Sequence, residues 1–211
     1  MADQQLESVL RAGLEQLRLP VEDSVVQKLL GYLGQLERWN GTYNLTAVRD
    51  PGEMVTKHIL DSLSVLPWAP SGTLLDAGAG AGLPGIPLAI ANSSLQVTLV
   101  DSAGKKVRFM NHVRRNLGLD NVHPVQARVE EMAAGAPFDL VVSRAFTSIA
   151  AFLASVRHLA DGATRLLVMK GRYPEAEIAE LPDWAEVSSV EKLSVPGLHE
   201  NRHLVIMSVN P

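Results

Sequence analysis

Short apolar runs alternate with helical patterns after residue 72, and this alternation constrains the fold more than any other feature of the chain. The apolar runs predict strands at residues 73–77, 96–100, 123–126, 140–143 and 166–169. The segments between and after them predict helices at residues 84–91, 105–117, 147–159 and 174–181. Continuous apolar strands separated by helices are typical of a parallel sheet covered on both faces. Two consecutive strand patterns, at residues 185–195 and 202–210, predict an antiparallel pair at the end of the sheet.

The first 70 residues have a different, helical pattern. Apolar residues recur at helical spacing over residues 5–39, and Pro20 divides them into two helices, with the proline in a first-turn position. Residues 39–53 are rich in turn formers, and residues 51–66 predict a third helix. Pro and Gly residues then mark a boundary. We therefore predict a helical region over residues 1–70 and a second domain over residues 71–211.

Composition excludes several kinds of protein. The chain has 211 residues, no cysteine and a formal charge of −4, so thiolate chemistry is excluded and a nucleic-acid partner would have to bind a local basic patch. The N-terminus lacks a basic run followed by an apolar core, and no apolar run approaches the roughly 20 residues that span a bilayer. These features predict a cytoplasmic protein without a membrane partner.

A glycine-rich stretch follows the first predicted strand. The sequence LLDAGAGAGLPGIPLAIA, residues 74–91, contains two overlapping fingerprints. Gly80, Gly82 and Gly85 fit the spacing of a dinucleotide loop, whereas Asp76 precedes a closer set that begins at Gly78. A carboxylate ahead of the loop would oppose a pyrophosphate but suits the sulfonium and ammonium groups of S-adenosylmethionine (SAM). The stretch therefore favours SAM as the cofactor.

A second acid supports an adenosine ligand. Asp101 ends the second predicted strand, where a carboxylate can accept hydrogen bonds from ribose hydroxyls; it could also cap the following helix. Val129 and Glu130, after the third strand, are candidates to line the adenine, although a Glu in such a stretch is as often a surface residue.

Several segments together resemble the RsmG family of bacterial 16S rRNA guanine-N7 methyltransferases, also known as glucose-inhibited division protein B. They are NLTAVRDPGEMVTKHILDSL, DAGAGAGLPGIPLAI, LVDSAGKKVRFM, VQARVEEM, FDLVVSRAF and MKG. The resemblance implies an α/β, Rossmann-like class I SAM-dependent methyltransferase sheet, mostly parallel with a terminal antiparallel strand pair, beside an N-terminal helical layer. It implies methyl transfer to N7 of the guanine at position 527 in standard 16S numbering. By resemblance, the donor contacts fall on Gly78, Leu83, Val129, Glu130 and Arg144, while Asp76, Gly80 and Asp101 match the general methyltransferase pattern.

The chemistry of guanine N7 makes few demands on the protein. N7 has an in-plane lone pair and no proton, so alignment and exclusion of water supply most of the catalysis and no general base is required. We assign Arg144 a positioning role, in which it either holds the donor carboxylate or steers the guanine through O6 or a phosphate, because an Arg bond to N7 itself would block the attack. Pyrimidine C5 methylation commonly uses a cysteine, and the chain has none.

The predicted RNA contacts are local. Lys105 and Arg108 share a face of one predicted helix, and Lys170 and Arg172 follow the fifth strand, at the edge where open α/β sheets bind ligands. His58 and Asp61 share a helical face, which suits a structural polar pair better than a metal site, so we predict no metal.

Three other functions remain open from the residues alone. These are a small-molecule methyltransferase on the same fold, a dinucleotide-dependent oxidoreductase, and an RNA-binding or assembly factor without activity. The favoured partner is 16S rRNA, the small ribosomal subunit or its assembly intermediate, bound by a monomer; DNA is not expected. Asn44 either approaches the guanine or holds a turn.

Overall fold

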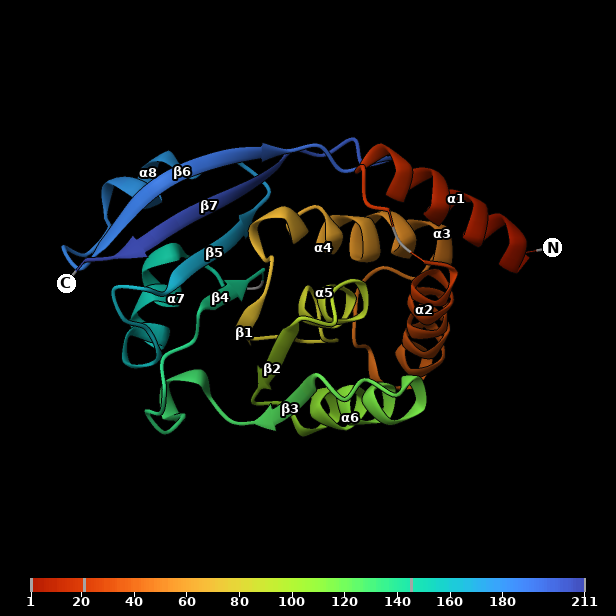
Figure 1. Ribbon diagram of the computed structural model, residues 1–211, viewed down its shortest axis with the longest axis horizontal. Helices are drawn as coiled ribbons and strands as arrows, with labels where there is room; N and C mark the ends of the chain where they lie inside the picture. Colours follow the sequence, from red (N-terminus) through yellow and green to blue (C-terminus); the bar gives the residue numbers. More distant parts are fainter. Residues whose placement is uncertain (1, 21, 145, 211) are drawn as a thin grey trace.

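The computed structural model describes residues 2–20, 22–144 and 146–210, which form a seven-stranded sheet with helices on both faces (Figure 1). The strand order is β3-β2-β1-β4-β5-β7-β6. Five strands pair in parallel, and β7 is antiparallel to both β5 and β6. The bounds are β1 Gly72–Ala77, β2 Leu95–Asp101, β3 Val122–Gln126, β4 Leu140–Ser143, β5 Arg165–Lys170, β6 Ala185–Leu193 and β7 Arg202–Val209. The predicted α/β class and its terminal antiparallel pair are confirmed.

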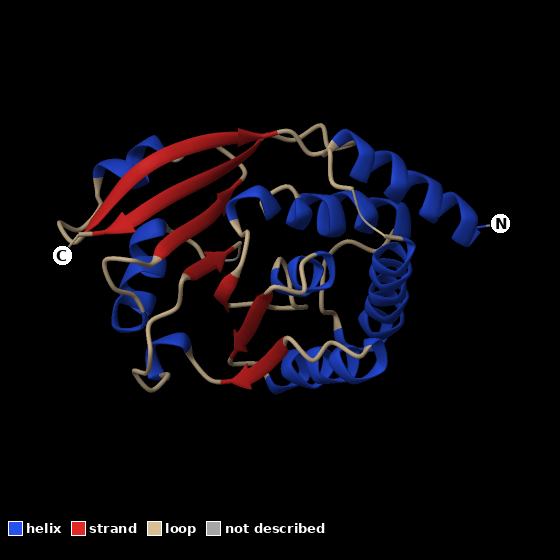
Figure 2. Ribbon diagram, in the orientation of Figure 1, coloured by secondary structure: helices blue, strands red, loops and turns tan. Residues whose placement is uncertain are grey.

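Helices alternate with the parallel strands, as Figure 2 shows. Helix α7 begins after Ser148, whose hydroxyl accepts a hydrogen bond from the Ala151 N–H at 3.1 Å, so the predicted start at residue 147 is close. The helices are α5 Gly85–Ala91, α6 Gly104–Leu117, α7 Ile149–Val156 and α8 Glu175–Ala179, with short 3₁₀ segments η3 Val129–Glu131 and η4 Arg157–Leu159.

The N-terminal layer differs from the prediction in three places. Helix α1 spans Ala2–Gln16 and α2 spans Asp23–Tyr43, so Pro20 lies before α2 rather than in its first turn. The predicted turn from residue 39 was wrong up to Tyr43, because the buried Asn40 side chain bonds the Thr46 N–H and the Val48 carbonyl beyond the helix end. The predicted third helix is divided into α3 Pro51–Met54, a π-helical turn η1 Val55–Leu60 and α4 Asp61–Leu63, followed by the 3₁₀ segment η2 Leu66–Trp68.

The strands alternate their side chains between two hydrophobic clusters, one on each face of the sheet. Leu74 belongs to the cluster with α1, α2, α5 and α6, whereas its neighbour Leu75 belongs to the cluster with α7. Leu29 and Leu36 of α2 share the first cluster, so the helical layer and the sheet bury one continuous core. The division at residue 70 stays a prediction.

Candidate functional site

The glycine loop lies between the end of β1 and the start of α5, at the carboxyl edge of the sheet. Gly78, Gly80 and Gly82 have φ of 73°, 61° and 85°, a conformation that side chains rarely adopt. A Cβ on Gly82 would overlap the Ile86 side chain, whereas a Cβ on Gly80 would meet no protein atom within 4 Å. Gly82 is therefore required by packing inside the protein, while Gly80 borders open space that a ligand can approach.

Three side chains from three different elements hold the loop in place. The Asp76 carboxylate, on β1, accepts a hydrogen bond from the Gly85 N–H at 2.8 Å. Asp101, at the end of β2, accepts one from the Gly80 N–H at 2.9 Å. Tyr32, on α2, donates its hydroxyl to the Ala81 carbonyl at 2.9 Å. The N-terminal layer thus contacts the loop directly.

Asp76 lies beneath the loop and not on the surface that a ligand would touch. Its side chain is fully buried, and its Oδ1 atom has no hydrogen-bond partner among the described residues. Burial raises the pKa of Asp76 to about 7, against the smaller effect of the Gly85 N–H. The carboxyl of Asp76, which favoured SAM in the sequence, therefore lies beneath the loop, where it holds the Gly85 N–H and shapes the backbone.

A cavity of about 350 Å³ opens beside the loop, and we call it the loop cavity. Its walls come from the segments that follow four parallel strands, where open α/β sheets bind ligands. It is lined by Gly78, Asp101, Ser102, Lys106, Ala127, Arg128, Val129, Glu130, Phe146 and Thr147. Four of the predicted donor-binding residues therefore meet in one place: Gly78, Asp101, Val129 and Glu130.

Six of the described lining residues were not predicted from the sequence, and Lys106 and Phe146 are the two whose contacts matter most for the cavity. Lys106 breaks the separation of charged and apolar faces along its helix, and its ammonium binds the Asp101 carboxylate at 3.1 Å. Phe146 lies 3.6 Å from the position of a Cβ on Gly78 and forms an apolar wall. Lys106 could have been found from its place in the first turn of the helix that follows Asp101; Phe146 carries no comparable signal.

The remaining predicted donor residues do not line the loop cavity. Leu83 is only 4% exposed and packs in the core, and Asp76 and Gly80 act through the loop backbone. Arg144 lies at a second cavity. Within the loop cavity, the Asp101 Oδ1 atom accepts one hydrogen bond, from the Ala103 N–H at 2.9 Å, so lone pairs remain that can accept a ribose hydroxyl.

The second cavity, of about 370 Å³, carries four cationic side chains, and we call it the cationic cavity. It is lined by Val48, Lys57, His58, Asp61, Arg144, Met169, Lys170, Gly171 and Arg202. The segment after β4 contributes to both cavities, since Arg144 lines this one and Phe146 the loop cavity. The two cavities are therefore lined by residues that lie two positions apart in the chain.

His58 and Asp61 both line the cationic cavity, and each binds a different segment. His58 Nε2 and the Thr46 hydroxyl are 2.9 Å apart, and burial lowers the pKa of His58 to about 4, with the charge of Arg144 a smaller cause. The imidazole is therefore neutral at neutral pH. Asp61 binds Arg144 and Arg202. The predicted structural pair is thus two separate anchors of the helical layer.

The predicted RNA-binding residues lie in two groups. Lys170 is in the cationic cavity, where its ammonium binds Glu177 at 2.8 Å, and Arg172 is exposed beyond it. Lys105 donates to the Tyr43 carbonyl at the end of α2, at 2.8 Å, and Arg108 is exposed on α6. The structure brings only Lys170 to the same cavity as Arg144.

Asn44 ends α2 in the left-handed conformation, with φ of 48°. Its side-chain amide oxygen, Oδ1, accepts a hydrogen bond from Arg49 Nη2 at 3.2 Å. This geometry agrees with a turn-holding role for Asn44. It does not place the side chain in either cavity.

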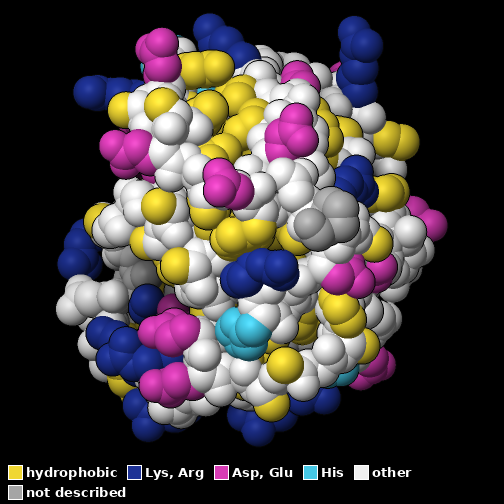
Figure 3. All heavy atoms as spheres, turned by 90° about the vertical axis from the view of Figure 1, so that its left-hand side faces the viewer, with side chains coloured by type: hydrophobic (Ala, Val, Ile, Leu, Met, Phe, Trp, Pro, Cys, Tyr) yellow, Lys and Arg dark blue, Asp and Glu magenta, His cyan; other side chains and the backbone are white. Residues whose placement is uncertain are grey.

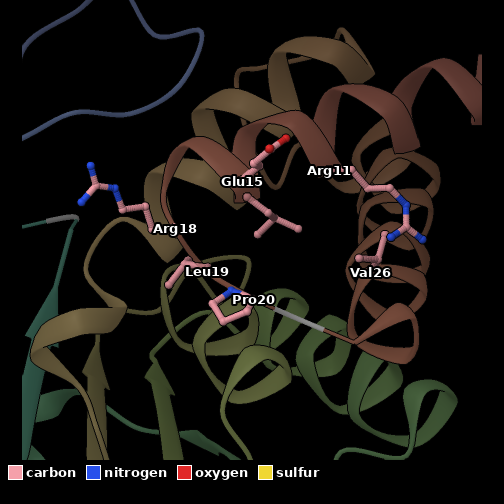
Figure 4. A pocket seen from close by; sticks show the side chains of 7 residues that line it. Arg11, Glu15, Arg18, Leu19, Pro20 and Val26 are labelled. Atoms are coloured by element: carbon pink, nitrogen blue, oxygen red, sulfur yellow. The ribbon is translucent and has the colours of Figure 1, made fainter.

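A third cavity, of about 440 Å³, lies within the helical layer between α1 and α2 (Figure 4). Glu15, Leu19 and Pro20, labelled in Figure 4, are among its lining residues. Arg11 also lines it and forms ion pairs with Glu7 and Asp23. None of its lining residues comes from the glycine loop.

Figure 3 shows the surface on the left-hand side of Figure 1, which carries α7 and α8. Acidic and basic side chains are interspersed over this face.

Comparison with known proteins identifies the family. The family model for rRNA small subunit methyltransferase G, GidB, matches residues 25–205. The chain belongs to this family. The ribosomal RNA small subunit methyltransferase G of Serratia proteamaculans is 49% identical over 206 residues, which cover 97% of this chain and 98% of that protein. Its counterpart in Alkalilimnicola ehrlichii is 47% identical over 205 residues, which cover 97% and 93%.

Solved structures of methyltransferases share the fold of this family member at low identity. A putative methyltransferase of Escherichia coli, yhhF, has a TM-score of 0.57 and 12% identity over 72% of this chain and 86% of that chain. Coclaurine N-methyltransferase, solved with N-methylheliamine and SAH, has a TM-score of 0.56 and 12% identity over 92% and 74%. No helix among the described residues is both long and apolar enough to cross a membrane.

Proposed function

We propose that the protein transfers the methyl group of SAM to N7 of a guanine in 16S rRNA, at position 527 in standard numbering. The observation that carries the proposal, for a member of this family, is the pair of cavities at the carboxyl edge of the sheet. One is bordered by a glycine loop, the other by four cations, and the segment after β4 lines both.

The loop cavity is the proposed donor site. Gly78 would let the backbone approach the ligand, and Asp101 retains lone pairs that can accept a ribose hydroxyl. Val129 and Phe146 offer apolar surface for the adenine, beside Glu130 at the rim. When bound, SAM supplies a methyl group on a sulfonium. The charges that line this cavity balance, since Lys106 binds Asp101 and Arg128 binds Glu130, whereas among the described residues the cationic cavity has Asp61 as its one acidic lining residue against four cations; a balanced lining suits a ligand that has no phosphate.

The cationic cavity is the proposed acceptor site. Arg144, Lys57, Lys170 and Arg202 provide positive charge for the phosphates that flank a guanine. Arg144 can also donate to guanine O6, which leaves N7 free to attack. Since N7 carries no proton, the protein needs to hold two reactants in line and exclude water. Arg172, Lys105 and Arg108 are proposed as outer contacts with the RNA, and we further propose a cytoplasmic monomer.

The experiment is methyl transfer from SAM carrying a labelled methyl group. Purified protein is incubated with naked 16S rRNA, small subunits and free nucleosides, and the modified base is mapped. The proposal predicts N7-methylguanosine at one position in rRNA or subunits and no product from nucleosides. Product from nucleosides alone would favour a small-molecule methyltransferase, and the absence of N7-methylguanosine from every substrate would refute the proposal.

A further inference from the structure

Asp61 is a buried carboxylate that joins three segments distant in the sequence. It begins α4 and is 1% exposed. Its Oδ2 atom accepts a hydrogen bond from Arg144 Nη1 at 3.3 Å, and its Oδ1 atom accepts one from Arg202 Nε at 3.0 Å. Arg144 follows β4 and Arg202 begins β7. One side chain of the helical layer therefore fixes two arginines at the carboxyl edge of the sheet.

The contacts of Arg144 use only one edge of its guanidinium. Nη1 donates to Asp61 and to the Lys57 carbonyl, the latter at 3.1 Å. No described residue accepts a hydrogen bond from Nη2 or Nε. Arg144 lines the cationic cavity and keeps a quarter of its side chain exposed, at 25%. Asp61 thus restrains Arg144 while leaving part of its donor fork available.

Arg202 is held more completely. Its Nε binds Asp61, its Nη1 donates to the Asn201 carbonyl at 3.0 Å, and its Nη2 binds Glu200 at 3.2 Å. With each nitrogen engaged, Arg202 balances the charge of Asp61 and fixes the carboxylate in turn. Asp61 also follows directly on the π-helical turn η1, a kind of element that is frequent at functional sites.

We propose that Asp61 is a positioning residue for methyl transfer, which holds Arg144 so that its unengaged N–H groups face the acceptor guanine in the cationic cavity. This inference rests on the proposed function, because it takes the cationic cavity as the place of the acceptor base. Asp61 does not touch the reacting atoms; it acts through Arg144.

Asp61→Asn tests the inference because it preserves size and removes the charge. Its amide oxygen can accept from one arginine only, and its NH₂ group then opposes the N–H groups of the other. Loss of a negative charge does not weaken the attraction of the cavity for phosphate. Because misplacement by 1 Å can reduce a rate about 100-fold, we expect kcat to fall at least about tenfold. We expect no rise in KM for RNA and unchanged SAM affinity by calorimetry.

Asp139→Asn is the control, because Asp139 is an exposed carboxylate whose hydrogen bonds are structural and lie away from both cavities. Asp139 accepts hydrogen bonds from the Thr73 N–H at 2.7 Å and the Thr73 hydroxyl at 2.8 Å, at the opposite end of β1. Asp139→Asn is expected to have a lower free energy of unfolding than the parent and an unchanged kcat. A general loss of packing in Asp61→Asn would instead lower SAM affinity and the active fraction while leaving kcat per active site intact.

Two further variants keep the inference open to refutation. Asp61→Glu retains the charge between the two arginines, and its extra methylene displaces Arg144, so kcat should fall as for Asp61→Asn. Asp61→Asn combined with Arg144→Lys is expected to lose no more activity than Arg144→Lys alone. Unchanged kcat in both Asp61 variants, or independent additive losses in the double variant, would overturn the inference. A parent enzyme that forms no N7-methylguanosine is a different result, and it would refute the proposed function itself.

Discussion

Asp76→Asn is expected to change how stability depends on pH, because the parent carboxyl is buried with a raised pKa. In the unfolded chain this carboxyl ionises above its ordinary pKa of 3.8, whereas in the folded protein it stays protonated up to about 7. Between these values, unfolding releases a proton, so a rise in pH lowers the stability of the parent. One such proton changes the free energy of unfolding by about 1.4 kcal/mol per pH unit, or about 4 kcal/mol over the whole interval.

Denaturant unfolding of both proteins without ligand, from pH 4 to pH 8, measures this effect. All other titrating groups contribute to both proteins and cancel in the difference. The advantage of Asp76→Asn over the parent is predicted to grow from pH 4 to pH 7 and then level off. An amide at this position also has an unpaired polar atom, which changes the free energy of unfolding of Asp76→Asn by an amount that does not depend on pH. A difference that is constant across the range would show that Asp76 keeps an ordinary pKa and would refute the reasoning.

Three further substitutions test the loop and the RNA surface. Tyr32→Phe removes a buried hydrogen bond to the glycine loop, so the free energy of unfolding measured with denaturant should fall by about 1–2 kcal/mol. Calorimetry should also show weaker SAM binding. Unchanged stability and unchanged SAM affinity would contradict the proposal that α2 holds the loop. Gly80→Ala and Gly118→Ala share a φ near 60° and open surroundings, so each is expected to lose roughly 1 kcal/mol of stability, but only Gly80→Ala is expected to lose SAM affinity. Arg172→Gln should raise KM for RNA and reduce the slope of log affinity for RNA against log salt concentration by about one, the value for one lost phosphate contact. Arg165→Gln, at another exposed arginine, is the control. Equal effects of the two substitutions would remove Arg172 from the interface.

The central strands of the sheet could be predicted closely from the sequence because they are buried on both faces. Runs such as LVV at residues 140–142 are apolar throughout, and the structure places that strand at the predicted residues 140–143. The helical layer was harder. The apolar spacing of residues 51–66 fits one helix, and it does not reveal that the hydrogen bonds change to a π pattern over Val55–Leu60. The end of α2 depends on bonds from Asn40 to residues beyond the helix, which no local pattern indicates.

The candidate site could be predicted where it follows strand ends. Gly78, Asp101, Val129 and Glu130 each lie at such an end, and they meet in the loop cavity. The roles of Asp76 and Arg144 required three-dimensional information. Asp76 sits between apolar neighbours in a strand buried on both faces, which was the available signal that it is buried. The position of Arg144 depends on Asp61, which lies 83 residues away along the chain.

The most direct test of the account uses rRNA in which the target guanine carries C–H in place of N7. All contacts to phosphates and to O6 are retained, and only the attacking lone pair is lost. We expect this RNA to bind as tightly as normal rRNA and to accept no methyl group from SAM. Methylation of the altered RNA at the same nucleotide would contradict attack by N7 and the mechanism built on the two cavities.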